Sequence, residues 1–233
     1  VGRWAAFTAG WCSIQDEASM LIARLLDPQP GELVADVCAA PGTKTTHLAQ
    51  LMGNRGKIVA MDPNAARLRL LTQAATRLGV SIVEAHVGGV AAVSGRWKDR
   101  CDRVLVDAPC SNLGVVRRNP DVKWKREEAE LDRLAEKQHG ILETAAGLVK
   151  PGGRLVYATC SLEPEENDDL VRAFLDRHPA FRVDAPAGFL VTPGADGMIR
   201  CLPHVHGTDG FTAVRLIRAG ALQPPRLSGK VTP

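Results

Sequence analysis

The chain has 233 residues, of which 45% are hydrophobic and 24% are charged, and its formal net charge is +3. This composition is that of an ordinary globular protein, and it excludes disordered, collagen-like and coiled-coil chains. The modest positive charge permits a nucleic-acid partner without requiring one, and the low aromatic content of 4% disfavours a passive stacking platform for single strands.

The six cysteines are scattered, at positions 12, 38, 101, 110, 160 and 201, without a CxxC pair or a metal-ligand spacing with the six histidines. No apolar run approaches the ~20 residues that span a bilayer, and we expect no signal peptide. These features predict free thiols in a reducing cytoplasm, with no membrane partner and no bound metal. We also expect a monomer.

Apolar strands alternate with helices along most of the chain. The strands are expected at residues 33–38, 57–62, 81–87, 103–107, 154–159 and 211–217. Helices are expected at about 43–52, 67–78 and 129–149, and the last of these meets the stop signal Lys150-Pro151-Gly152-Gly153. This alternation predicts βαβ units, and hence an α/β fold with a mostly parallel sheet covered by helices on both faces.

The two ends of the chain differ from this pattern. Residues 1–30, with a short helix opening at residues 15–19, are expected to form an adjunct packed on a main domain of residues 31–220. The Pro-rich residues 221–233 are expected to form a loose tail.

A glycine-containing turn follows the first predicted strand, and an acid ends the second. The turn is Ala39-Ala40-Pro41-Gly42-Thr43-Lys44, and Asp62 comes twenty residues after Gly42. Such a pair indicates a nucleotide site, because the turn admits the ligand against the backbone while the carboxylate binds ribose hydroxyls. The turn departs from GxGxxG and from the phosphate loop GxxxxGK[ST], so a ligand with ribose but no phosphates fits better. S-adenosylmethionine is the common one.

Two further turns place a cysteine just past the carboxyl end of a predicted central strand, where α/β folds build their sites. They are Asp107-Ala108-Pro109-Cys110-Ser111 and Thr159-Cys160-Ser161. A thiolate that adds to C6 of a pyrimidine makes C5 nucleophilic enough to accept a methyl group, and a carboxyl group supports the charge that develops on the ring. A base must then remove the C5 proton before the enzyme is released. Cys160, Asp107 and Cys110 are the candidates for this chemistry.

These motifs together resemble the Sun/Fmu/Nop family of RNA cytosine-5 methyltransferases, from about Gly10 to Arg218. The resemblance is carried by Asp36-Val37-Cys38-Ala39-Ala40-Pro41-Gly42-Thr43-Lys44-Thr45, Asp107-Ala108-Pro109-Cys110-Ser111, Tyr157-Ala158-Thr159-Cys160-Ser161 with Pro164-Glu165-Glu166-Asn167, residues 117–124 and Asp209-Gly210-Phe211.

The resemblance implies a Rossmann-like methyltransferase fold with a seven-stranded sheet, S-adenosylmethionine as cofactor and 16S ribosomal RNA as substrate. It implies that Cys160 attacks the base and that Cys110 assists release, with Asp107 as the acidic partner. The implied cofactor-binding residues are Cys38, Ala39, Ala40, Pro41, Gly42, Thr43, Lys44, Asp62 and Asp107.

The sequence departs from the family pattern at two places. Thr43 stands where the family usually has a second glycine, and at a positive φ this threonine would cost on the order of 1 kcal/mol. Val87-Gly88-Gly89-Val90 stands where the family usually has an aspartate near the adenine of the cofactor. Its absence would weaken the contact to the adenine amine.

A basic segment follows the Cys110 turn, with Arg117, Arg118, Lys123, Lys125 and Arg126 surrounding Trp124. Its place beside the predicted site favours contact of Arg117, Arg118, Lys123 and Trp124 with RNA, and the alternative is a solvated loop. The acidic residues 163–169 are interpreted as the first turn of a helix that begins at Pro164.

Two other functions are consistent with parts of the sequence. A DNA cytosine-5 methyltransferase would use the Pro-Cys thiol as nucleophile, but the second motif around Cys160 and the absence of a large target-recognition insertion disfavour it. A ribosome-assembly factor that kept the fold and lost activity is favoured only by Gly88 and Gly89. The intact Cys110, Cys160, Asp107 and Lys44 oppose that interpretation.

Overall fold

The computed structural model describes residues 4–125 and 127–220. The predicted tail of residues 221–233 and the basic residue Arg126 therefore lie outside the described residues. Within the described part of the chain, no helix combines the length and the apolarity that crossing a bilayer requires.

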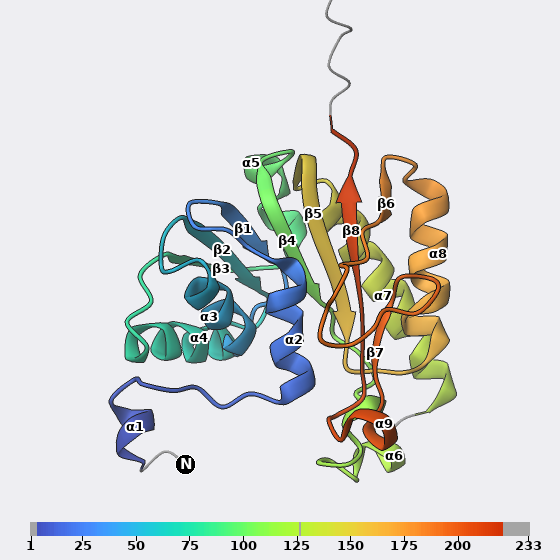
Figure 1. The fold of residues 1–233 in the computed structure, drawn as a ribbon, viewed down its shortest axis with the longest axis horizontal. Helices are drawn as coiled ribbons and strands as arrows, with labels where there is room; N and C mark the ends of the chain where they lie inside the picture. The colour runs from blue at the N-terminus through green and yellow to red at the C-terminus, as the bar shows by residue number, and fades with distance from the viewer. Residues whose placement is uncertain (1–3, 126, 221–233) are drawn as a thin grey trace, which may run out of the picture.

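One mixed sheet is the centre of the molecule (Figure 1). Its order is β3-β2-β1-β4-β5-β8-β6, and the short β7 also pairs with β8. The first five strands of this order are parallel, whereas β6 and β7 run antiparallel to β8, and so does β5. The strands are β1 (Leu33–Asp36), β2 (Lys57–Asp62), β3 (Val83–Val87), β4 (Cys101–Asp107), β5 (Val149–Thr159), β6 (Phe181–Val183), β7 (Ile199–Cys201) and β8 (Phe211–Arg218).

The predicted mostly parallel sheet with a seven-strand path is confirmed, and β7 adds an eighth strand within the described residues. Strands β6 and β7 escaped prediction because each has only three residues, too few to show a period of two. Strand β5 begins at Val149 rather than at residue 154, because Val149 already pairs with Cys101 of β4. The preceding helix accordingly ends at Ala146, three residues before its predicted end.

Helices cover both faces of this sheet. Short 3₁₀ turns lie at Val90–Ala92, Leu113–Val115 and Pro164–Glu166, so Pro164 opens a 3₁₀ turn ahead of the next helix. The helices are α1 (Ala5–Thr8), α2 (Glu17–Leu26), α3 (Thr43–Leu51), α4 (Ala65–Arg77), α5 (Ser94–Trp97), α6 (Val122–Lys125), α7 (Glu128–Ala146), α8 (Asp168–Arg177) and α9 (Pro203–His206).

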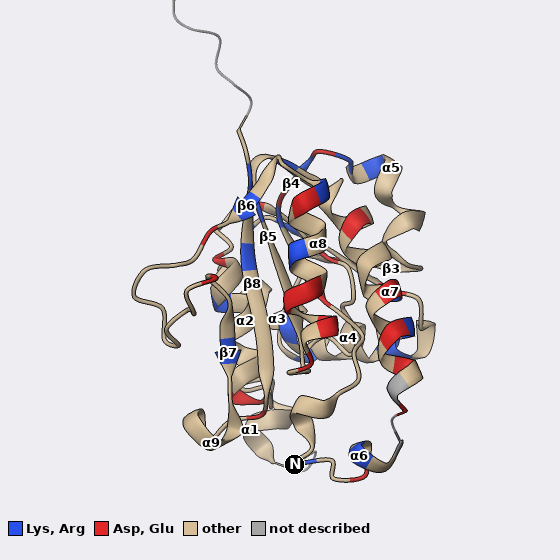
Figure 2. Ribbon diagram, turned by 90° about the vertical axis from the view of Figure 1, so that its right-hand side faces the viewer, with Lys and Arg blue, Asp and Glu red and all other residues tan. Residues whose placement is uncertain are grey.

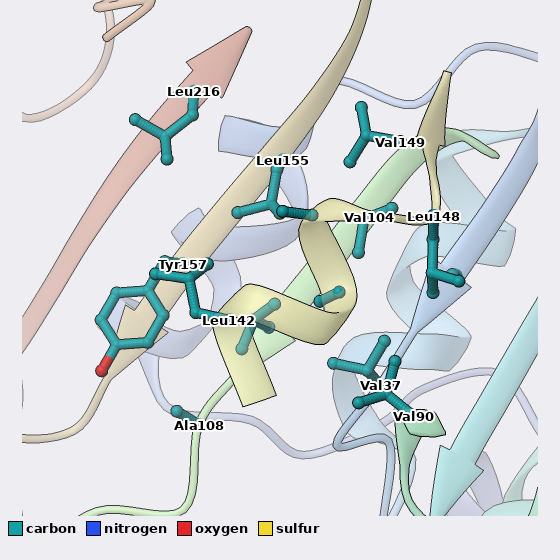
Figure 3. Close-up of a cluster of buried hydrophobic side chains, with 14 of the residues drawn as sticks. Val37, Val90, Val104, Ala108, Leu142, Leu148, Val149, Leu155, Tyr157 and Leu216 are labelled. Carbon is teal, nitrogen blue, oxygen red and sulfur yellow. The ribbon is translucent and has the colours of Figure 1, made fainter. Parts of the chain in front are cut away.

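Successive side chains of the central strands point to opposite faces of the sheet and pack into two separate hydrophobic cores. Val104 and Val106 of β4 lie in one core with residues of α7 and α8, whereas Leu105 between them lies in the other core with residues of α2 and α3. Figure 3 shows the first core, in which Leu142 of α7 lies close to Tyr157 of β5. The strands are therefore buried on both faces, as their continuous apolar sequences require.

Helix α2 belongs to the second core. Its N-cap is Asp16, whose side chain accepts a hydrogen bond from the Ala18 amide at 2.9 Å. Ala18, Ile22 and Leu26 are almost fully buried and pack with residues of α3 and the sheet. The N-cap end of α2 thereby comes to the edge of the sheet at which β1, β4 and β5 end (Figure 1).

Candidate active site

A cavity of about 710 Å³ lies at the carboxyl ends of β1, β2, β4 and β5. Parallel strands bring the turns that follow them to one edge of a sheet, which is why segments far apart in the sequence meet here. Of the predicted cofactor-binding residues, Cys38, Ala40, Thr43, Lys44, Asp62 and Asp107 line the cavity. The two predicted catalytic cysteines, Cys110 and Cys160, line it as well.

The turn after β1 depends on a glycine. Gly42 has a φ of +107°, and a Cβ at this position would lie only 2.7 Å from the Leu71 side chain in α4. The residue that needs glycine is therefore Gly42, and Thr43 follows it as the first residue of α3. The Thr43 departure from the family pattern consequently brings no backbone strain.

Asp62, at the end of β2, supports this turn while it faces the cavity. Its Oδ2 accepts a hydrogen bond from the Ala40 amide at 3.3 Å, and its Oδ1 accepts one from the Asn64 amide at 2.8 Å. The Arg67 guanidinium donates a hydrogen bond to the Ala40 carbonyl at 2.6 Å, so both backbone polar groups of Ala40 are bonded to side chains. Ala39, Pro41 and Gly42 belong to the turn but do not themselves line the cavity.

A buried carboxyl group lies under the turn. Asp36 ends β1 with 1% of its surface exposed, and the Thr45 hydroxyl donates to its Oδ2 at 2.7 Å. Its Oδ1 is buried without a hydrogen-bond partner among the described residues. Burial raises the pKa of Asp36 from 3.8 to about 7, because desolvation penalises the charged carboxylate.

Lys44 connects the first turn with the end of β4. Its Nζ lies 2.7 Å from Oδ2 of Asp107 and 5.2 Å from the ring centroid of Phe211 at the start of β8. The ion pair is largely shielded from solvent, which strengthens it relative to a surface pair. Neither Phe211 nor its contact with Lys44 was recognised as part of the site from the sequence.

The two cysteine thiols come together in the cavity. Their sulfur atoms are 2.9 Å apart, although the residues are separated by fifty positions. Cys110 is buried, whereas Cys160 is partly exposed. The hydrogen bond to Cys160, followed by burial, raises the pKa of the Cys110 thiol well above its usual range. Burial likewise raises the pKa of Cys38, which also lines the cavity. Because its thiol stays protonated, Cys38 is not a third candidate nucleophile.

A buried network that the sequence did not reveal holds the two cysteine turns. Glu166 accepts hydrogen bonds from the backbone amide and hydroxyl of Ser111 at 2.8 and 2.5 Å, and from the Gln138 amide at 2.8 Å. The Ser111 hydroxyl also lies 3.1 Å from that of Ser161. The interpretation of residues 163–169 as a first helix turn did not reveal that the Glu166 side chain is fully buried.

Backbone groups fix the Cys160 turn from the other side. The Gly114 amide donates to the Cys160 carbonyl at 3.0 Å, and the Gly210 amide donates to the Gly114 carbonyl at 2.8 Å. A Cβ on Gly114 would lie 2.2 Å from the Gly210 carbonyl oxygen, so only glycine permits this approach. The sequence signal for this contact was the Asp209-Gly210-Phe211 motif, whose partner could not be identified.

The predicted RNA-binding residues do not line the cavity. Arg118 forms ion pairs with Asp16 and Asp209, which do line the cavity, and Arg117 also pairs with Asp209. Lys123 and Trp124 lie in α6, where Trp124 is 79% exposed. Figures 1 and 2 place α6 at the end of the molecule toward which β4 and β5 point.

Gly89 and Val90 line the cavity at the end of β3, in the segment that lacks the expected aspartate. Within residues 4–125 and 127–220, no group of three histidine, cysteine or acidic side chains is arranged to hold a metal ion.

Comparison with known proteins gives consistent results. "Probable ribosomal RNA small subunit methyltransferase B" of Bacillus subtilis (strain 168) is 42% identical over 220 residues, which cover 92% of this chain and 49% of the relative. "Ribosomal RNA small subunit methyltransferase B" of Shewanella oneidensis is 40% identical over 222 residues, or 91% of this chain and 49% of the relative. The chain thus spans about half the length of these curated relatives.

A solved structure and a family model agree with these relatives. The crystal structure of NSun6 from Pyrococcus horikoshii with SFG has a TM-score of 0.85 and 32% identity, over 95% of this chain and 56% of that one. The family model described as 16S rRNA methyltransferase RsmB/F matches residues 23–217. The chain therefore belongs to the 16S rRNA methyltransferase RsmB/F family.

Proposed function

We propose that this chain is the S-adenosylmethionine-dependent catalytic domain of an RNA cytosine-5 methyltransferase that acts on 16S ribosomal RNA. The observation that carries the proposal is the pair of thiols, 2.9 Å apart, in the same cavity as the Lys44–Asp107 ion pair. Family membership supports the class of reaction and of substrate. The cysteine pair supports the covalent route and the choice of C5.

The cavity suits S-adenosylmethionine. Asp62 places a carboxylate at the end of β2, where ribose hydroxyls bind in doubly wound folds, and Gly89 and Val90, a small and an apolar residue, line the part of the cavity after β3 that is proposed for adenine. When bound, the cofactor supplies an electrophilic methyl group. SFG in the similar NSun6 structure is an analogue of this cofactor, which supports the assignment.

The chain's own residues then have separate roles. Cys160 Sγ forms a bond to C6 of the cytosine, and the displaced electron pair makes C5 the carbon that takes the methyl group. Asp107, oriented by Lys44, donates a proton to N3 of the ring as the sulfur adds, so that the ring gains no negative charge, and it takes this proton back when the sulfur leaves. Cys110 first gives its own thiol proton to solvent and then, as a thiolate, removes the C5 proton; the electron pair of that C–H bond expels the Cys160 sulfur from C6.

The different surroundings of the two cysteines favour this order over the DNA-type mechanism. A nucleophile must reach the base and must form a thiolate. Cys110 is the more buried of the pair, and its raised pKa keeps it protonated while Cys160 attacks. Cys160 is the more exposed of the two.

Contact with RNA is proposed for the basic segment after the Cys110 turn. Arg117 and Arg118 pair with acids that line the cavity, Lys123 lies in α6 beside Trp124, and Trp124 is exposed, so that a base can stack on its ring. A cytoplasmic location and a monomeric state stay predictions.

The test is a denaturing gel of two variants incubated with 16S RNA and cofactor. Cys160→Ser should give neither a covalent adduct nor methylation, because the nucleophile is gone. Cys110→Ser should accumulate a protein–RNA adduct, because attack proceeds while proton removal and release fail. Bisulfite sequencing of the RNA reports the methylated cytosine.

Two results would overturn the proposal. An adduct that persists in Cys160→Ser and disappears in Cys110→Ser would establish the DNA-type assignment. Tight RNA binding by the wild-type protein, with no methylation in the presence of cofactor, would establish the inactive assembly factor.

A further inference from the structure

Of the residues that the structure describes, three with cationic side chains line the cavity, and the protein itself engages only two of them. Lys44 pairs with Asp107, and the Arg67 guanidinium donates to the Ala40 carbonyl. Lys137, on α7, is the third, and its ammonium group has no ion pair or hydrogen bond to any other described residue. Its charge is therefore free to meet a ligand, and none of the roles described above involves it.

Helix α7 brings Lys137 to the part of the cavity that follows β3. The helix packs against the 3₁₀ turn that begins at Val90, and Val90 lines the cavity. Ile141, one helical turn after Lys137, also lines the cavity and packs against the core that contains Val90. Burial dominates the pKa of the Cys38 thiol and raises it, and the charge of Lys137 acts on that pKa in the opposite direction. Lys137 is thus within electrostatic reach of the turn after β1 as well.

The segment after β3 carries no acidic side chain into the cavity. Gly89 and Val90 line it there, in place of the aspartate expected from the sequence. A carboxylate in this segment would accept hydrogen bonds from the 6-amino group of a purine, whereas an ammonium group can only donate. A purine in this part of the cavity consequently meets a donor on Lys137 and no carboxylate from β3.

We propose that Lys137 is a specificity-determining residue for the cofactor, and that its ammonium group donates a hydrogen bond to the edge of the purine that carries the 6-substituent. Adenine offers this donor its ring nitrogen N1, and a purine with an oxygen at C6 offers a carbonyl acceptor. The site should therefore tolerate a 6-oxopurine form of the cofactor, which a carboxylate would reject. The inference rests on the proposed function, because it requires the cofactor to bind in this cavity.

Substitutions at this position separate the charge from the fold. Lys137 is exposed on α7, and methionine and glutamate are both good helix formers. Lys137→Met keeps most of the length of the side chain and removes the donor. Lys137→Glu replaces the donor by an acceptor, and so reverses the preference that the proposal assigns to this residue.

The experiment is calorimetry with S-adenosyl-L-homocysteine and S-inosyl-L-homocysteine, which differ by an amine or an oxygen at C6 of the purine. The measured quantity is the Kd of the inosyl ligand divided by that of the adenosyl ligand, so that a general loss of binding cancels. We expect the two Kd values of the wild-type protein to agree within about threefold. The ratio should rise about fivefold in Lys137→Met, because a charge-assisted hydrogen bond to the oxygen is lost. It should rise further in Lys137→Glu, because the carboxylate accepts from the amine and repels the oxygen.

The matched controls are Lys98→Met and Lys98→Glu, since Lys98 is an exposed lysine that does not line the cavity. Both controls should keep the wild-type ratio, and thermal unfolding should show all variants folded. A ratio that is unchanged in both Lys137 variants, or that falls in Lys137→Glu, would overturn the inference while the proposed function stands. Unchanged ligand binding together with weaker RNA binding in Lys137→Met would assign this lysine to an RNA phosphate instead. Absent binding of both ligands to the wild-type protein would overturn the proposed function itself.

Discussion

The turn after β1 and the two cysteine turns lie in one cavity but are held in different ways. The first is shaped by Gly42 at positive φ and by hydrogen bonds to its backbone, such as the one that the Ala39 amide donates to the Met61 carbonyl near the end of β2. The cysteine turns are tied by buried side chains from other elements, above all Glu166 and Gln138. A local turn can bind a cofactor with modest precision, whereas two thiols must be placed to within a fraction of an ångström.

This difference predicts different effects for substitutions in the turn after β1 and for substitutions in the network around the cysteine turns. Damage to the turn after β1, which is proposed to bind the cofactor, should lower the affinity for S-adenosylmethionine. It should leave the distance between the two thiols unchanged. Damage to the network around the cysteines should lower both stability and turnover, because its polar groups are buried and have no water to replace a lost partner.

The largest combined effect on stability and turnover is expected from Glu166→Ala, which removes three hydrogen bonds inside the network. We expect a loss of about 3 kcal/mol in the free energy of unfolding, and no detectable methylation, since the Cys110 turn loses its tie to the residues after Cys160. Urea unfolding and a methylation assay measure the two effects. The exposed neighbour Glu165→Ala is the control and should change stability by no more than about 0.5 kcal/mol. Equal stability of both variants would contradict the buried network.

The buried carboxyl under the cofactor turn predicts a pH dependence of stability. Because the pKa of Asp36 is about 7 in the folded protein and 3.8 for an aspartate in water, the folded state binds the extra proton between these values. Stability from this group is therefore fully present below pH 3.8 and falls as pH rises to about 7, by about 1.4 kcal/mol per pH unit. Asp36→Asn should remove this fall, which unfolding at several pH values would measure. If the free energy of unfolding fell with pH equally in the wild-type protein and in Asp36→Asn, the titrating group would be a residue other than Asp36.

A smaller effect is expected from Asp62→Ala, on the cofactor side of the comparison. Loss of hydrogen bonds from ribose to a charged group should cost about 1.5–3 kcal/mol of S-adenosylmethionine affinity in calorimetry. Asp62→Asn keeps one acceptor oxygen and should lose less. Unchanged affinity in the alanine variant would remove Asp62 from the cofactor site. The exposed Asp176→Ala on α8 is the control for a general effect of charge.

The smallest effect is expected in the basic segment. Replacement of Arg117, Arg118 and Lys123 by Gln should weaken RNA binding uniformly, and each phosphate that is no longer bound should flatten the salt dependence by about one unit of slope. Arg118→Gln alone should change the slope least, since Asp16 and Asp209 already occupy its guanidinium group. An unchanged slope in the triple variant would make the segment an ordinary solvated loop. Arg172→Gln, exposed on α8, is the control.

The sequence by itself determined the features that depend on neighbours along the chain. Strand β2 was predicted at its observed residues, and the sheet was predicted as mostly parallel, because apolar runs and turn residues are local signals. The motifs also located Asp62, Asp107, Cys110 and Cys160, since parallel strands bring their carboxyl ends to one edge of the sheet.

Only the tertiary structure decided which of these side chains touch and what holds them. Glu166 stands in a run of charged residues that is typical of an exposed turn, and its burial depends on Ser111 and Gln138, 55 and 28 positions away. The same is true of Asn112, whose left-handed backbone aims an oxygen at the Cys160 sulfur across 48 positions. Hydrogen bonds of this kind act at about 3 Å and depend on direction, so they appear only when the elements have packed.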